Sequence, residues 1–127
     1  MSDFVTEAKQ SITGIRMIVA GGRDFNPLQC HYDWIAKVIN QEKPTEIVSG
    51  TCSGADKFGE KAAIHYGIKI KQFPADWDKY GKMAGPRRNA QMAEYADICV
   101  LFPGGKGTDN MRRLAHENGL KVIEYGR

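Results

Sequence analysis

From about residue 14 onward, short runs of β-branched and apolar residues alternate with longer amphipathic stretches. Five of these runs are typical of buried strands, and they cover residues 15–20, 46–48, 68–73, 97–102 and 120–125. Strands that alternate with helices need crossover connections, which favour a parallel sheet with helices on both faces. The pattern therefore predicts an α/β fold: a single Rossmann-like domain with a five-stranded, mainly parallel sheet.

The amphipathic stretches predict four helices between the strands. The first is expected to begin at Pro27 with Asn26 as its cap, and its apolar face holds Leu28, Ile35, Val38 and Ile39. The second covers residues 55–66, and the third and fourth begin at Pro86 and Thr108. In such sheets ligands bind beyond the carboxyl ends of the strands, so the loops after the strands are where function is expected.

Two segments stand apart from this alternation. Residues 1–13 are polar with little periodicity and are expected to form a leader ahead of the domain, which covers residues 14–127. The connection at residues 74–85 is the one long loop inside the domain. Long loops in compact domains often serve as binding loops or lids, so we expect this one to contribute to a site.

Composition narrows the class of protein. The 127 residues, 42% hydrophobic and 26% charged, fit one ordinary globular domain. The three cysteines are widely spaced and show no metal-ligand pattern, which is typical of reduced thiols in a cytoplasmic protein without a metal site. No apolar stretch approaches the roughly 20 residues of a membrane span. The net charge of +3 is small and interspersed, which disfavours nucleic acid and favours anionic small molecules.

The most informative segment follows the fourth predicted strand and reads Gly104, Gly105, Lys106, Gly107 and Thr108. Glycines let the backbone approach a ligand closely, and the N–H groups at the start of the next helix attract phosphate. The alternative is a plain glycine turn with a threonine cap. Neither the GxGxxG fingerprint nor the lysine position of a P-loop is present, which disfavours ATP hydrolysis by that mechanism.

The loops after the first and second strands supply eight more candidate ligand contacts: Gly21, Gly22, Arg23, Asp24, Ser49, Gly50, Gly54 and Asp56. Arg23 can hold a phosphate through two hydrogen bonds, and Asp24 can accept one from a ribose hydroxyl. Two structural alternatives stay open: Arg23 and Asp24 form an internal ion pair, or Ser53 or Asp56 merely caps the following helix.

The long loop and the third helix add a further group of candidates. Trp77 and Tyr80 can stack on a base, while Arg88 and Asn89 at a helix N-terminus can bind a phosphate or sugar. Alternatively, the aromatic residues cover the edge of the sheet and the arginines are solvated. Cys52 lies near a helix N-terminus, but no histidine is predicted beside it, so a nucleophilic role is disfavoured.

Five segments, at residues 17–25, 48–56, 74–77, 84–89 and 102–108, together resemble the YspA, or cpYpsA-related, branch of the SLOG superfamily. The resemblance implies a Rossmann-like fold that binds a nucleotide or a nucleotide-derived molecule, such as NAD or an ADP-ribose derivative. A sensor, a carrier or a sequestering protein fits this expectation. It also implies a homodimer or a higher homo-oligomer.

The chain is also similar, more distantly, to the LOG-type nucleoside-monophosphate phosphoribohydrolases. They share a Pro-Gly-Gly-x-Gly-Thr loop and an arginine on the preceding helix, which residues 103–108 and Arg88 match. Glutamates follow that loop in the LOG type, whereas this chain continues with Asp109 and Asn110. Hydrolysis of an N-glycosidic or phosphoester bond therefore stays an alternative to binding, with Asp76 as the candidate catalytic carboxylate.

Overall fold

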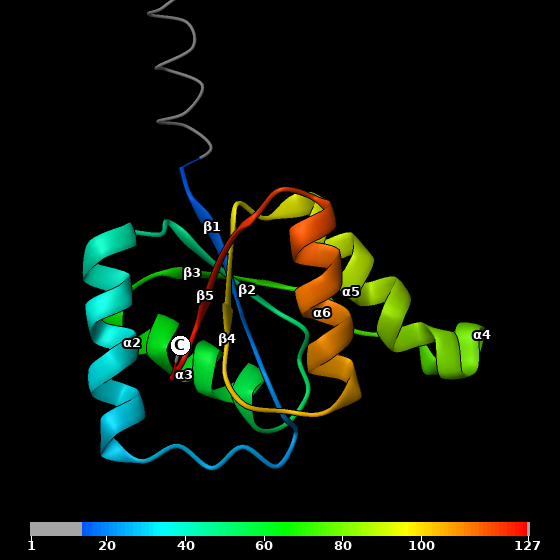
Figure 1. The fold of residues 1–127 in the computed structure, drawn as a ribbon, viewed down its shortest axis with the longest axis horizontal. Helices are drawn as coiled ribbons and strands as arrows, with labels where there is room; N and C mark the ends of the chain where they lie inside the picture. The colour runs from blue at the N-terminus through cyan, green and yellow to red at the C-terminus, as the bar shows by residue number, and fades with distance from the viewer. Residues whose placement is uncertain (1–13, 127) are drawn as a thin grey trace, which may run out of the picture.

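The computed structural model describes residues 14–126, so the expected leader at residues 1–13 lies outside the described residues. Within them is one five-stranded sheet, formed by β1 (Arg16–Ala20), β2 (Glu46–Ser49), β3 (Lys69–Gln72), β4 (Ile98–Leu101) and β5 (Lys121–Glu124) (Figure 1). The strand order is β3-β2-β1-β4-β5, and every neighbouring pair is parallel. The predicted α/β, Rossmann-like fold is confirmed. The strand order reverses between β1 and β4, which is where ligands bind in such sheets.

Helices cover both faces of the sheet, as predicted. The helices α2 (Gln29–Glu42) and α3 (Ala55–Tyr66) pack on one face, and α5 (Ala84–Tyr95) and α6 (Lys106–Glu117) pack on the other (Figure 1). The long connection contains a short helix, α4 (Trp77–Tyr80), and the 3-10 helix η1 (Gly81–Met83). No helix in the described part of the chain is long and apolar enough to cross a membrane.

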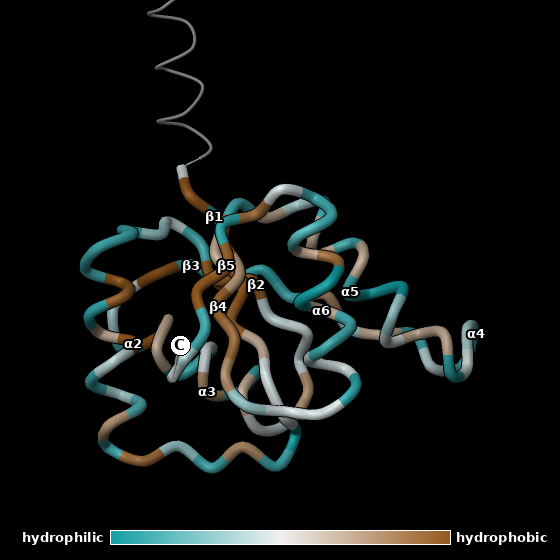
Figure 2. The backbone as a smooth tube through the Cα atoms, in the orientation of Figure 1, coloured by the Kyte–Doolittle hydropathy of each residue, from teal (hydrophilic) through white to brown (hydrophobic). Residues whose placement is uncertain are grey.

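The strands form the hydrophobic centre of the molecule, as Figure 2 shows. Their side chains alternate between the two faces. In β1, Met17 and Val19 pack with α2 and α3, whereas Ile18 and Ala20 pack with α5 and α6. Because helices cover both faces of the central strands, β1 and β4 are apolar at nearly every position, which explains their continuous apolar runs in the sequence.

The start of α2 differs from the prediction. Asn26 and Pro27 lie in an irregular segment before the helix, and Leu28, expected on the apolar face, is 62% exposed. The cap is formed instead by the Nδ1 atom of His31, which accepts a hydrogen bond from the N–H of Leu28 at 2.8 Å. The ring of Phe25 packs edge-on against His31 and fixes the chain in this path ahead of the helix.

Both helices of the other face begin two residues earlier than predicted. Pro86 lies in the first turn of α5, where backbone N–H groups have no partner within the helix, so the missing N–H of proline costs no hydrogen bond. In α6 the carbonyl of Gly105 accepts a hydrogen bond from the N–H of Asp109 at 3.0 Å, so the two residues before Thr108 already belong to the helix. Thr108 is therefore buried in the first turn and is not the cap.

The close packing of α3 on β1 can be tested at Gly59, where an added Cβ would lie 2.7 Å from the Cβ of Val19. We predict that Gly59→Ala lowers the free energy of unfolding by about 1–3 kcal/mol, because the helix must move away from the sheet. Gly107→Ala in α6 is the matched control, since an added Cβ there meets no atom within 4 Å. Denaturant unfolding of both variants checks this, and equal stabilities would contradict the packing.

Candidate functional site

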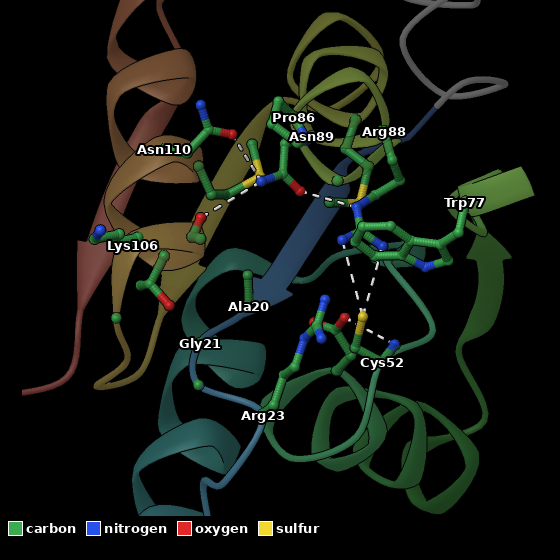
Figure 3. Close-up of a pocket in the computed structure, with 18 residues that line it drawn as sticks. Ala20, Gly21, Arg23, Cys52, Trp77, Pro86, Arg88, Asn89, Lys106 and Asn110 are labelled. Carbon is green, nitrogen blue, oxygen red and sulfur yellow. Dashed lines mark hydrogen bonds between the residues drawn. The ribbon is translucent and has the colours of Figure 1, made fainter. Parts of the chain in front are cut away.

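A cavity of about 510 Å³ opens at the carboxyl ends of the central strands, where the loops after β1, β2 and β4 meet the first turns of α5 and α6. Figure 3 shows Lys106 and Asn110 of α6 on one side of it and Trp77 of α4 on the other. The position agrees with the edge at which a doubly wound sheet binds its ligands. A volume of this size is typical of small-molecule sites.

Gly22 joins the three loops that form the floor of the cavity. Its N–H donates to the carbonyl of Pro103 at 2.9 Å, and its carbonyl accepts from the N–H of Ala55 at 3.1 Å. An added Cβ at Gly54 would lie 2.2 Å from the Gly22 carbonyl oxygen, and one at Gly104 would lie 2.6 Å from the Gly22 nitrogen. The glycines at these two positions are therefore required for the loops to approach one another.

The first turn of α6 presents its backbone to the cavity, where Lys106, Gly107 and Thr108 line the wall. No group within residues 14–126 accepts a hydrogen bond from the N–H groups of these three residues, and Gly105 provides no side chain to cap them. Unpaired N–H groups at a helix start carry a partial positive charge. This wall can therefore bind an anion through the backbone, with the Lys106 ammonium group nearby.

Arg88 of α5 adds a buried guanidinium group, only 8% exposed. It donates to the carbonyl of Gly50 and, at 2.9 Å, to Oδ1 of Asn89, and both terminal nitrogens lie 3.9 Å from Sγ of Cys52. Over the described residues it forms no ion pair with a carboxylate. A buried charge without an opposite charge in contact is costly, and an anionic ligand in the cavity would offset that cost.

Asn89 connects α5 to α6. Its side-chain oxygen accepts from Arg88, and its amide nitrogen donates to Oδ1 of Asn110 at 2.9 Å and to the carbonyl of Gly107 at 3.4 Å (Figure 3). Because both ends of the Asn89 amide are occupied, it holds the guanidinium group and the α6 backbone in fixed relative positions. The two groups that can bind an anion are thereby prearranged.

Asp56 is the single carboxylate among the described residues that line the cavity. It is 7% exposed, and its Oδ2 accepts from the N–H of Cys52 at 3.0 Å. Burial raises the pKa of this carboxyl above its ordinary value, although the Cys52 N–H and the charges of Arg88 and Arg23 act in the opposite direction. At neutral pH the ionised form thus costs folding free energy.

The chain belongs to a known family. A model of the YspA, cpYpsA-related SLOG family matches residues 15–80, about half of the chain. This chain is a member of that SLOG family. It is also similar to the Gene 61 protein of Mycobacterium phage D29, with 30% identity over 122 residues that covers 87% of this chain and 96% of the relative. No solved structure matches significantly.

The SLOG-like segments converge on the cavity. Eleven of the residues proposed from the sequence as ligand contacts line it: Gly21, Gly22, Arg23, Asp56, Trp77, Arg88, Asn89, Gly105, Lys106, Gly107 and Thr108. Arg23 lies over the Trp77 ring, 5.4 Å from its centre, and forms no ion pair with Asp24 within the described part of the chain. Trp77, at 47% exposed, stands at the rim rather than in the core.

Six of the proposed ligand contacts do not line this cavity: Asp24, Ser49, Gly50, Gly54, Asp76 and Gly104. Gly50 and Gly54 shape the backbone, Gly104 packs on Gly22, and Ser49 donates to Glu60 at 2.7 Å. Asp76, the candidate catalytic carboxylate, caps α4 by accepting from the N–H of Lys79 at 3.1 Å.

Asp109, which takes the place of the LOG glutamate, also lies outside the lining and pairs with Arg112 at 2.7 Å.

Seven residues that line the cavity were not proposed as ligand contacts from the sequence: Ala20, Cys52, Gly85, Pro86, Met92, Asn110 and Met111. Asn110 carried a usable signal, because it lies one turn after the glycine loop on the same helix face as Gly107. The apolar members are indistinguishable from core residues in a sequence.

Thiol chemistry tests this placement of the cysteines. Cys99 is fully buried, and burial raises its pKa to about 12, whereas Cys30 is exposed and Cys52 opens to the cavity. We predict that a thiol reagent at pH 8 modifies two cysteines of the folded protein and the third only after unfolding, since the thiolate is the reactive form. Cys52→Ser should reduce the number of rapidly modified cysteines in the folded protein to one. Rapid modification of Cys99 would contradict the structure.

Proposed function

We propose that the cavity binds the phosphate of a nucleotide or of a nucleotide-derived molecule. The observation that carries this proposal is the pairing of two anion-binding groups on one cavity: the free N–H groups of α6 and the guanidinium group of Arg88. Each can bind a phosphate oxygen with a charge-assisted or dipole-assisted hydrogen bond. Membership of the SLOG family supports the same class of ligand.

The rest of the cavity supports a ligand larger than a phosphate ion. At about 510 Å³ it has room for a sugar and a base beside the phosphate. Trp77 at the rim offers an aromatic face for a base, and Arg23 already stacks over it. These features favour a nucleotide, NAD or an ADP-ribose-type molecule, bound by a sensor, a carrier or a sequestering protein.

Binding is the conclusion that the geometry supports best. A hydrolase of this ligand needs a carboxylate fixed near the sugar to deliver water or to stabilise a ribosyl cation. Asp76 caps α4 and Asp109 pairs with Arg112, so neither side chain lines the cavity in its described position. Asp56 is the carboxylate that does line it, and it accepts a backbone hydrogen bond.

Gly105 offers a steric test of the proposed phosphate site. An added Cβ there meets no atom within 4 Å, so Gly105→Tyr should fold normally while its ring obstructs the cavity. We predict that calorimetry with ADP, NAD and ADP-ribose detects binding to the wild type and none to Gly105→Tyr. Glu94→Tyr on the exposed side of α5 is the control and should bind normally. Unchanged affinity in a folded Gly105→Tyr protein would refute the phosphate-site assignment.

Arg88 offers an electrostatic test with its neighbour as control. We predict that Arg88→Gln weakens binding of the same ligands about 10- to 100-fold, the size expected for losing a hydrogen bond to a charged group. Arg87→Gln should leave affinity unchanged, because Arg87 is exposed and stacks 4.3 Å from the centre of the Tyr80 ring. Equal effects of the two substitutions would argue against a direct role for Arg88.

Turnover separates binding from catalysis. Wild-type protein incubated with nucleoside monophosphates, NAD, ADP-ribose and cyclic derivatives is expected to release neither base nor phosphate rapidly when the mixture is followed by chromatography. Multiple turnovers that are abolished by Asp76→Asn would instead assign the protein to the hydrolases, with α4 moved toward the ligand.

A further inference from the structure

We infer that Asp56 selects ligands with a free ribose hydroxyl, so that the cavity prefers ribonucleotides to their deoxy counterparts. This inference rests on the proposed function, since it concerns the sugar of the molecule whose phosphate binds at α6. It assigns a chemical role to the one carboxylate that the described lining residues contribute.

The hydrogen bonds of Asp56 leave half of its carboxylate available. Oδ2 accepts from the N–H of Cys52 at 3.0 Å, and no donor within residues 14–126 bonds to Oδ1. The residue is 7% exposed and lines the cavity, so the space from which Oδ1 can be reached is the ligand space. No buried side-chain oxygen among the described residues lacks a hydrogen-bond partner, so Oδ1 opens to the cavity, where water can donate to it. A ligand that displaces this water must supply an O–H or an N–H in its place.

Charge excludes the phosphate from this position. A phosphate beside the Asp56 carboxylate would place two anions in contact, whereas the first turn of α6 and the guanidinium group of Arg88 attract it. The cavity thus contains an acceptor for a neutral donor in addition to its anion-binding groups. A nucleotide matches this combination, because its phosphate is bonded directly to a sugar that carries hydroxyl donors.

The backbone brings the two positions together. Asp56 follows Ala55, whose N–H donates to the carbonyl of Gly22, and the N–H of Gly22 donates to the carbonyl of Pro103, just ahead of α6. Gly22 therefore links the first turn of α3, which bears Asp56, to the loop that leads into α6. Asp24, the ribose contact proposed from the sequence, is exposed and lies outside the cavity lining.

Removing the sugar hydroxyl should be costly. With a deoxy ligand Oδ1 of Asp56 stays buried without a donor, and sites built to bind a hydroxyl reject analogues that lack it. We expect the wild type to bind the ribose form about 10- to 100-fold more tightly than at least one of the 2′-deoxy and 3′-deoxy forms, as for a hydrogen bond to a charged group.

The experiment uses calorimetry with ADP, 2′-deoxy-ADP, 3′-deoxy-ADP and inorganic pyrophosphate on the full chain. Asp56→Asn should reduce the ribose preference, because the amide oxygen keeps the Cys52 hydrogen bond and the N–H₂ group can bond the sugar hydroxyl only through a weaker bond between neutral groups. Its affinity for pyrophosphate should stay equal or rise, since one negative charge is removed. Asp24→Asn is the matched control and should keep the ribose preference.

Each remaining outcome has one meaning. Equal wild-type affinity for ADP and both deoxy forms would overturn the role of Asp56 and leave phosphate binding intact, and this comparison requires no variant. An undiminished ribose preference in Asp56→Asn, which includes a loss of ADP and deoxy-ADP affinity by the same factor, would overturn it as well. Absence of all nucleotide and pyrophosphate binding by the wild type would overturn both the inference and the proposed function.

Discussion

The site depends on the contact among three loops at Gly22. The N–H of Gly22 donates to the loop after β4, and its carbonyl accepts from the start of α3. The loops after β1, β2 and β4 are therefore held within hydrogen-bonding distance. Glycines at positions 54 and 104 permit this approach, because a Cβ at either would overlap the Gly22 backbone. The contact lies where the strand order reverses, and it fixes the helix starts that surround the cavity.

The polar groups around this contact reduce the stability of the folded protein. Arg88 is buried without a carboxylate in contact among the described residues, and burial raises the pKa of Asp56. Each buried charge destabilises the folded protein when no group in the cavity pairs with it. The side-chain amide of Asn89 keeps Arg88 in position, because its oxygen accepts from Arg88 and its nitrogen donates to Asn110. Costly but well-ordered polar groups of this kind are typical of functional sites.

The sequence predicted the centre of the sheet well, because helices cover both of its faces and β1 and β4 appear as nearly uninterrupted apolar runs. It failed where tertiary contacts decide the backbone. Asn26 and Pro27 look like a helix start, yet His31 supplies the cap and Phe25 fixes the path. Loop residues could be assigned to the correct edge of the sheet but not to the cavity itself. Asp76 and Asp56 were both proposed as ligand contacts, and the structure places Asp76 as a helix cap and Asp56 in the cavity lining.

The central claim is that the first turn of α6 binds a phosphate. Nuclear magnetic resonance of ¹⁵N-labelled protein titrated with ADP tests it most directly, because each backbone N–H reports its own hydrogen bond. The account predicts that the signals of Lys106, Gly107 and Thr108 show the largest shifts, with saturation at a single affinity. Unchanged signals there, with the largest shifts at the groove between α2 and α3 that Tyr32 and Tyr66 line, would contradict it.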